Sequence, residues 1–229
     1  MEYSDKFQRY ELKFILTLDQ YHLIKKAMEP YMVQDQYGET DICNLYCDTS
    51  DFRLVRRSNE KPFYKEKLRI RSYGVLKEDM KVFIEIKKKF DSIVYKRRIE
   101  TDEKTAYHLL TGEVAYPSQI SQEISYFTKL YEGIQPQMFI SYHREAFYGV
   151  KDRDFRITFD KSILWRKYDL SLSSGIYGEP VLPENKILME IKTSSTIPLW
   201  LIKILSKNKI YKTSFSKYGT AYTMMLVKA

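Results

Sequence analysis

The chain has 229 residues, of which 44% are hydrophobic, and its formal net charge is +8. No apolar run approaches the roughly 20 residues that a membrane-spanning helix needs, and the polar N-terminus lacks the apolar region of a signal peptide. We therefore expect a soluble cytoplasmic protein, with one compact domain over residues 1–229 and an anionic partner.

The first half of the chain predicts a strand, a helix and then a run of strands. Apolar residues alternate over 9–17, and they recur at helical spacing over 18–32. Further strands are expected at 42–48, 63–74, 81–90 and 92–100, and the last three form an antiparallel meander because the gaps between them are short. Cys43 and Cys47 lie in the first of these strands and are expected to be reduced core residues. Residues 54–61 are expected to form a solvated turn.

The second half predicts helices, then strands, then helices again. One helix is expected at 102–111 with Thr101 as its cap, and one at about 119–132 after Ser118. Strands are expected at 137–150, 154–167 and 186–194. The chain closes with a helix from Pro198 and a helix from about 216 to 227. About eight mostly antiparallel strands with helices indicate an α+β fold, in which the sheet is a closed barrel or strongly curved.

Each predicted strand has one charged face and one more apolar face. In 65–71 the charged side chains alternate with Leu68 and Ile70, and the other strands repeat this pattern. Taken singly, each strand is best explained as part of a sheet with one face in water. Taken together, lysine and arginine dominate the charged faces, and like charges on neighbouring strands destabilise a sheet. A bound polyanion would compensate. If helices cover the apolar faces outside, the charged faces line the inside.

Nine motifs in order resemble the VTC domain, which belongs to the triphosphate tunnel metalloenzymes, also called the CYTH-like superfamily. They are RYELKF, NLYCDTSDF, KLRIRSYG, VFIEIKKK, YKRRIE, SYHREAF, RITFD, LMEIKT and FSKYG, spread over about residues 7–222. The resemblance implies an antiparallel eight-stranded β-barrel with helices packed outside. It also implies transfer of the γ-phosphate of ATP onto inorganic polyphosphate, with Mn²⁺ or Mg²⁺ as the cofactor.

The resemblance also implies the roles of individual residues. The catalytic set is basic: Lys13, Arg69, Arg71, Lys87, Arg144, Arg156 and Lys217. Further phosphate-binding residues are expected to be Lys67, Lys89, Lys96, Arg98, Tyr142, Lys192 and Ser216. Glu190 matches the glutamate that carries the metal, and Glu11 and Glu85 are further candidates. These residue types suit phosphoryl transfer, which needs positioning and charge neutralisation more than covalent catalysis.

The sequence departs from the hydrolytic members of the superfamily, which favour an ExExK opening. Arg9 stands at the first glutamate position, and the last strand carries Glu190 and Lys192 in place of two alternating glutamates. Fewer carboxylates mean fewer metals and less activation of water. The departure therefore favours a polyphosphate polymerase over a triphosphatase, an adenylyl cyclase or a thiamine triphosphatase.

Two alternatives stay open. One is a tunnel triphosphatase that hydrolyses inorganic triphosphate or nucleotides, and the other is a module that binds polyphosphate or nucleotide without turnover. Nucleic acid is not expected as a partner, because a duplex would not fit inside an eight-stranded barrel. No membrane span is expected, which leaves room for a separate membrane partner.

Overall fold

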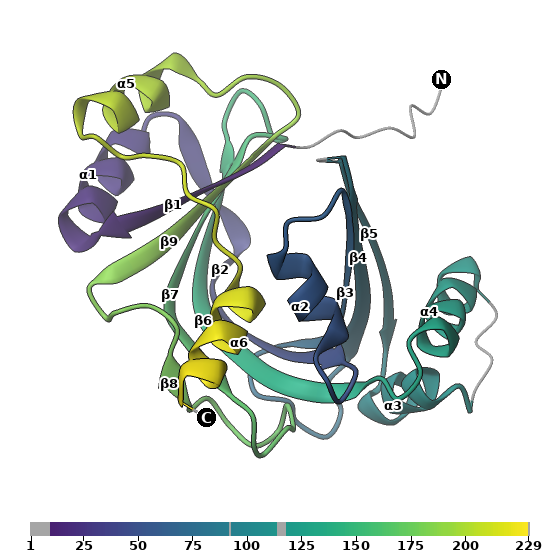
Figure 1. Cartoon of the computed structure of the whole chain (residues 1–229). Helices are drawn as coiled ribbons and strands as arrows, with labels where there is room; N and C mark the ends of the chain where they lie inside the picture. Colours follow the sequence, from purple (N-terminus) through teal and green to yellow (C-terminus); the bar gives the residue numbers. More distant parts are fainter. Residues whose placement is uncertain (1–9, 92, 114–117, 229) are drawn as a thin grey trace, which may run out of the picture. The chain divides into compact units, whose positions relative to one another are not determined.

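The computed structural model describes residues 10–91, 93–113 and 118–228, so Arg9 lies outside the described residues. Helices and strands mix in an α+β fold (Figure 1). The strands are β1 (Tyr10–Thr17), β2 (Met32–Asp48), β3 (Tyr64–Tyr73), β4 (Val82–Phe90), β5 (Ile93–Thr101), β6 (Gln135–Gly149), β7 (Arg156–Arg166), β8 (Glu179–Pro180) and β9 (Lys186–Thr193). The helices are α1 (Leu18–Met28), α2 (Arg53–Asn59), α3 (Glu103–Thr111), α4 (Gln119–Leu130), α5 (Leu199–Lys207) and α6 (Lys217–Lys228).

The strands are hydrogen-bonded in the order β1-β9-β7-β6-β2-β3-β4-β5, and β8 pairs with β7. The pairs β1–β9, β9–β7, β2–β3, β3–β4 and β4–β5 are all antiparallel. The expected antiparallel α+β fold with about eight strands is therefore confirmed. Within the described ranges, the path of paired strands begins at β1 and ends at β5.

The chain divides into two compact units. Unit 1 contains residues 1–40, 142–163 and 182–215, and unit 2 contains residues 41–141, 164–181 and 216–229. Strands β2, β6 and β7 contribute residues to both. The expectation of a single domain over the whole chain stays a prediction, and the two units are described separately below.

The core of unit 1 is formed by the apolar faces of β1, β7 and β9 and by helices α1 and α5. Phe14, Phe159 and Met189 are buried together with Ile24 of α1 and Leu201 of α5. Helix α1 begins directly after β1, at a capping box formed by Thr17 and Gln20. Since alternate residues of a strand point to opposite faces, this packing turns the charged residues of β1 and β9 away from the two helices.

A buried carboxylate in unit 1 gives a prediction about pH. Glu145 is 1% exposed, lies 2.6 Å from Lys25 Nζ, accepts a hydrogen bond from Tyr21 and pairs with Lys161. Burial alone would raise the pKa of Glu145, but Lys161, Lys25 and Tyr21 outweigh it and lower the pKa from 4.5 to about 2. The resulting stability is present above about pH 4.5 and is lost as the pH falls towards 2.

We therefore expect Glu145→Gln to lower the free energy of unfolding by about 3 kcal/mol at pH 7. The gap between wild type and variant should narrow as the pH falls from about 4.5 towards 2, because the unfolded wild-type chain takes up a proton at Glu145 while the folded protein still holds the carboxylate ionised. Urea unfolding at each pH measures both values. A gap that stays constant across this range would contradict the role given to Glu145.

The core of unit 2 confirms which face of β3 is apolar. Leu68 and Ile70 are fully buried, together with Ile84 and Ile86 of the paired strand β4. Residues of α3 and α4 pack against them, namely Ala106, Leu109, Leu110, Ile124 and Phe127. Within this unit, α3 and α4 lie on one side of β3–β5, and α2 and α6 lie on the other (Figure 1). The charged residues of β3 therefore face away from α3 and α4.

Several local expectations were wrong. Residues 53–59 form helix α2 where a turn was expected, and Leu54, Val55 and Ser58 are buried in it. The cap of α3 is Asp102, whose side chain accepts a hydrogen bond from the Thr105 N–H at 2.8 Å. Thr101 is instead the last residue of β5.

The starts of α5 and β2 also differ from the expected positions. Pro198 precedes α5 as its cap, and β2 begins ten residues before the expected position 42. Cys43 and Cys47 are buried and unbridged, as expected. No helix in the described part of the chain has both the length and the apolar character that crossing a bilayer requires.

Candidate functional site

Unit 2 carries a continuous cationic face, formed by alternate residues of three paired strands. Its basic members are Lys65, Lys67, Arg69, Arg71, Lys87, Lys89, Lys96 and Arg98. The register places Lys67 opposite Lys87, and Lys87 opposite Lys96. These three residues are called the lysine row below.

The lysine row concentrates like charge. Residues directly opposite each other on antiparallel strands have Cβ atoms about 5 Å apart, so their side chains interact. Like charges in that arrangement destabilise the sheet. The adjacent row has Glu85 between Arg69 and Arg98, where the signs alternate. An anion bound over the lysine row would therefore reduce the repulsion between its three neighbouring ammonium groups.

Glu85 organises the cations around it. It is 1% exposed, and one of its oxygens lies 2.7 Å from both Nε and Nη2 of Arg69. Lys96 Nζ lies 2.6 Å from its other oxygen, and Arg71 Nη1 lies 3.8 Å away. Burial alone would raise the pKa of Glu85, but Arg69, Arg71 and Lys96 lower it far below its ordinary value. Glu85 therefore stays ionised, and a metal would have to compete with these cations for it.

Two residues of β2 also hold the arginines, and the sequence did not identify them. Tyr46 accepts a hydrogen bond from Nη1 of Arg69 at 3.1 Å. The side-chain oxygen of Asn44 accepts one from Nε of Arg71 at 2.9 Å. Each lies directly opposite its arginine in the β2–β3 register. Their positions in the NLYC motif were the available signal, but only the strand register reveals the pairing.

The cationic face meets the start of α6. Lys67 Nζ donates to Ser216 Oγ at 2.8 Å, and Ser216 Oγ accepts from the Gly219 N–H at 3.0 Å. Ser216 thus caps α6, and Lys217, 8% exposed, is the first helical residue. A helix N-terminus offers N–H donors and a favourable dipole to a phosphate. The sequence-based placement of these two residues at a helix start is confirmed.

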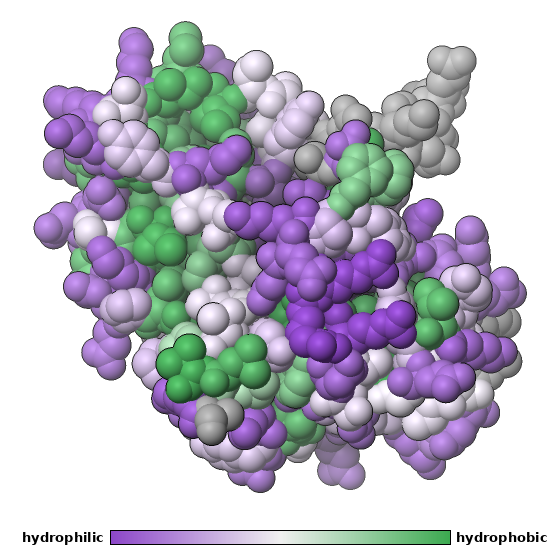
Figure 2. All heavy atoms as spheres, viewed as in Figure 1, coloured by the Kyte–Doolittle hydropathy of each residue, from purple (hydrophilic) through white to green (hydrophobic). Residues whose placement is uncertain are grey.

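The cationic face also meets the end of α2. Lys65 Nζ lies 3.4 Å from the Ser58 carbonyl oxygen, to which it donates. The exposed side of α2 bears Arg53, Arg56 and Arg57. Figure 2 shows strongly hydrophilic residues gathered over this helix. Basic side chains therefore continue from the strands onto α2.

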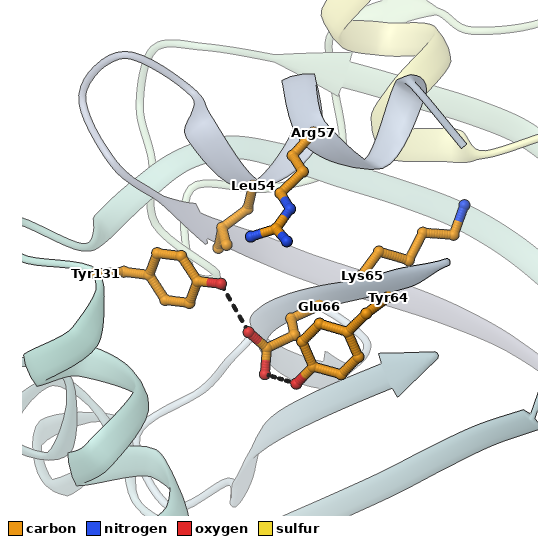
Figure 3. A pocket seen from close by; sticks show the side chains of 6 residues that line it. All are labelled: Leu54, Arg57, Tyr64, Lys65, Glu66 and Tyr131. Carbon is orange, nitrogen blue, oxygen red and sulfur yellow. Dashed lines mark hydrogen bonds between the residues drawn. The ribbon is translucent and has the colours of Figure 1, made fainter. Parts of the chain in front are cut away.

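A small pocket at the start of β3 is structural in character (Figure 3). The Glu66 carboxylate accepts hydrogen bonds from Tyr131, at 2.8 Å, and from Tyr64. Burial and the bond to Glu66 raise the pKa of Tyr131 to about 12, so it remains a neutral donor. Lys65 extends away from Glu66 (Figure 3). The pocket therefore ties the end of α4 to β3 and leaves Lys65 on the cationic face.

Unit 1 carries a second charged cluster, on β1, β6, β7 and β9. Glu190 lies 3.7 Å from Lys13 Nζ, 3.5 Å from Arg144 Nη2 and 3.4 Å from Lys192 Nζ. Arg144 donates two hydrogen bonds to Asp160, at 2.6 and 2.7 Å. Cations and carboxylates alternate in this cluster, in contrast to the lysine row of unit 2.

The remaining predicted residues of unit 1 lie around this cluster. Tyr142 is buried, and its ring centroid is 5.0 Å from the Arg144 guanidinium carbon. Arg156 is exposed and lies opposite Lys192 in the β7–β9 register. Glu11 lies opposite Lys192 on the other side, in the β1–β9 register. The structure therefore brings the predicted residues together in two sets, one in each unit.

The unit 1 cluster suits a hard divalent cation. Glu11 and Glu190 have oxygens 3.1 and 3.7 Å from the same atom, Lys13 Nζ, so the two carboxylates converge. Thr158 lies opposite Glu190, and its buried hydroxyl has no hydrogen-bond partner among the described residues. Mg²⁺ is commonly held by one or two carboxylates together with waters and substrate phosphates. No group of three or more His, Cys, Asp or Glu residues that could hold a metal was found in the described ranges.

Comparison with known proteins gives a consistent family and fold. A family model described as the VTC domain matches residues 8–226. A Bacillus halodurans structure provisionally assigned as an adenylate cyclase has a TM-score of 0.56 and 13% identity, over 91% of this chain and 95% of that one. A Hippeastrum protein with the same provisional assignment, described as having a dominant triphosphatase activity, has a TM-score of 0.56 and 16% identity, over 94% of each chain. At these identities the likeness shows the fold, and the search of curated proteins found no match.

Proposed function

Because this chain belongs to the VTC domain family, we propose that it is a metal-dependent polyphosphate polymerase. It takes ATP and inorganic polyphosphate as substrates, and it transfers the γ-phosphate of ATP to the end of the growing chain. The observation that carries the proposal is the lysine row, in which Lys67, Lys87 and Lys96 lie side by side. A repeating polyanion neutralises such a row along its length, since each of its phosphates carries negative charge.

The reaction needs little from the protein beyond positioning and charge. An oxygen of the terminal phosphate of the acceptor attacks the γ-phosphorus of ATP, the bond from that phosphorus to the bridging oxygen breaks, and ADP leaves with the electron pair. No general base is required, because the attacking oxygen is already an anion. Arg69 and Arg71 stabilise the charge of the transferring group, since a fixed guanidinium can donate two parallel hydrogen bonds to phosphate.

The other residues have supporting roles in this proposal. Lys13 and Arg144 neutralise further phosphate oxygens, and the N-terminus of α6 at Lys217 binds one phosphate. Glu190 would hold Mn²⁺ or Mg²⁺ with Glu11 nearby, and the bound cation would neutralise charge on the phosphate oxygens. Glu85 is not included as a metal ligand, because its two oxygens already contact Arg69 and Lys96 at 2.6–2.7 Å.

A triphosphatase is the second candidate, because a structural neighbour of the same fold is described as having that activity. Hydrolysis would require a group that activates water. Glu85 is a poor base here, because Arg69, Arg71 and Lys96 strongly lower its pKa. Glu190 already contacts three cations. The cations that surround both carboxylates therefore favour transfer to a phosphate acceptor over transfer to water.

Incubation of the purified protein with ATP and Mn²⁺ tests the proposal. We expect long polyphosphate chains on a gel and ADP in solution. Orthophosphate as the sole phosphate product would instead identify a triphosphatase. Unchanged ATP together with tight polyphosphate binding would identify a binding module.

A pair of adjacent lysines tests the lysine row directly. Lys87 lies on the cationic face, whereas Lys88 points to the opposite face and pairs with Glu123 at 3.6 Å. We expect Lys87→Ala to weaken binding of inorganic polyphosphate about tenfold, the value of one charged hydrogen bond to phosphate. The same loss of charge in Lys88→Ala should change the affinity less than twofold. Fluorescence anisotropy with labelled polyphosphate measures both, and equal effects of the two variants would contradict the assignment.

A further inference from the structure

A residue of β2 caps helix α2 from outside the helix. The residue before α2, Phe52, has a positive φ of 58° and makes no side-chain capping bond. The buried carboxylate of Asp48 instead accepts the N–H groups of Leu54 at 2.8 Å and Val55 at 3.0 Å. Thr49 Oγ1 accepts the N–H of Arg53 at 3.0 Å. The first turn of α2 is therefore fastened to the end of β2, because the donors that a helix start leaves unpaired find acceptors there.

The same carboxylate holds the first turn of α6. Tyr218, the second residue of α6, donates its hydroxyl to Asp48 at 2.9 Å and is 2% exposed. Burial and the neighbouring Asp48 raise the pKa of Tyr218 far above its ordinary value, so it remains a donor. One turn of α6 also touches α2 closely, since a Cβ on Gly219 would lie 2.4 Å from Asn59. Asp48 thus joins the starts of α2 and α6 at one point.

Tyr218 in turn supports an arginine of the cationic face. Its ring stacks on Tyr46, with centroids 4.6 Å apart and an interplanar angle of 17°. Tyr46 accepts the 3.1 Å hydrogen bond from Arg69. Contacts therefore run from Asp48 through Tyr218 and Tyr46 to Arg69. On the other side of the α6 start, Ser216 accepts the hydrogen bond from Lys67.

We propose that Asp48, Tyr218 and Tyr46 are positioning residues, which set Arg69 and the first turn of α6 in one fixed arrangement for binding phosphate. None of the three needs to touch the phosphate itself. The inference rests on the proposed function only in taking Arg69, Lys67 and Ser216 as phosphate-binding groups. The Arg69 guanidinium is held by Glu85 and by Tyr46. It therefore binds phosphate more tightly than a mobile guanidinium would, because less side-chain entropy is lost on binding.

Three tyrosine-to-phenylalanine variants of the full chain test the proposal. Tyr46→Phe removes the acceptor for Arg69 and keeps the ring stack, and Tyr218→Phe removes the donor to Asp48 and also keeps the stack. Tyr222→Phe is the matched control, since Tyr222 is a buried tyrosine one turn further along α6 whose ring lies against Phe52. Circular dichroism confirms that each variant is folded before use.

The measurement is the dissociation constant of inorganic polyphosphate as a function of salt concentration. We expect Tyr46→Phe and Tyr218→Phe to weaken binding of polyphosphate about threefold to tenfold. We also expect both to reduce the slope of log Kd against log salt by about the amount that one phosphate contact contributes. Tyr222→Phe should change neither. A merely structural role lowers the fraction of active protein and leaves both Kd and the slope unchanged.

The outcomes separate this inference from the proposed function. If wild type binds polyphosphate and both variants match its Kd and slope, the positioning role is overturned while the proposed function stands. If wild type neither binds polyphosphate nor consumes ATP, the proposed function is overturned and the positioning role with it. Weaker binding in both variants but not in Tyr222→Phe supports the positioning role, whichever phosphate product is found with ATP.

Discussion

Glu85→Gln should lower the free energy of unfolding by about 3 to 5 kcal/mol at pH 7. Glu85 is 1% exposed and is the shared partner of Arg69, Arg71 and Lys96, at 2.6 to 3.8 Å. The amide keeps the shape of the side chain but removes its charge. Three cations then lie together without their counter-charge, and the cost is large because little water reaches the site.

Chemical denaturation of wild type and variant measures this effect. Glu123→Gln is the control, because Glu123 also pairs with two cations, Lys88 at 3.6 Å and Arg97 at 3.8 Å, but its side chain is 26% exposed, against 1% for Glu85. Exposed ion pairs contribute about 0 to 1 kcal/mol, so the control should unfold almost as wild type does. A Glu85→Gln protein as stable as the control would show that Glu85 does not hold the cationic face together.

Polyphosphate should restore part of the lost stability. An anion that binds the folded state stabilises it in proportion to the logarithm of its concentration over its Kd. In Glu85→Gln the arginines retain their charge and lose their internal partner. The added ligand should therefore raise the unfolding midpoint of Glu85→Gln by more than that of wild type. An equal rise in both proteins would mean that polyphosphate does not contact the cations that pair with Glu85.

The sequence predicted the faces of β3 and β4 correctly, because a two-residue period combined with a buried apolar side leaves one solution. Leu68 and Ile70 had to pack against helices, so Arg69 and Arg71 had to point the other way. The capping of α4 by Ser118 and of α6 near Ser216 was also predictable, since a cap is a local signal within three residues.

Features that depend on register were beyond the sequence. The lysine row arises from which residue of β3 faces which residue of β4 and β5, and loop lengths do not fix that alignment. The pairing of Tyr46 with Arg69 has the same origin. Helix α2 was missed because its cap comes from Asp48, six residues before Leu54, while charged residues dominate its short sequence. The convergence of cations on Glu85 also required the register, because Arg69 and Arg71 come from β3 and Lys96 comes from β5.

Glu190→Gln should reduce polyphosphate synthesis about 100-fold, equivalent to about 3 kcal/mol, the scale expected when a cation that neutralises phosphate oxygens of the substrate is no longer held. The side chain keeps its size, so its place between β1 and β7 should be retained. Glu184→Gln is the control, because Glu184 is an exposed glutamate shortly before β9 and should leave the rate unchanged.

Polyphosphate binding without divalent cations separates this role from a structural one. Lys13, Arg144 and Lys192 all lie within 3.7 Å of Glu190, so removing its charge makes their surroundings more positive. We therefore expect Glu190→Gln to bind polyphosphate in a chelating buffer at least as tightly as wild type does. Binding that weakens in parallel with the rate would contradict a metal-holding role. It would show instead that Glu190 orients these three cations, because only loss of their arrangement could outweigh the gain in positive charge.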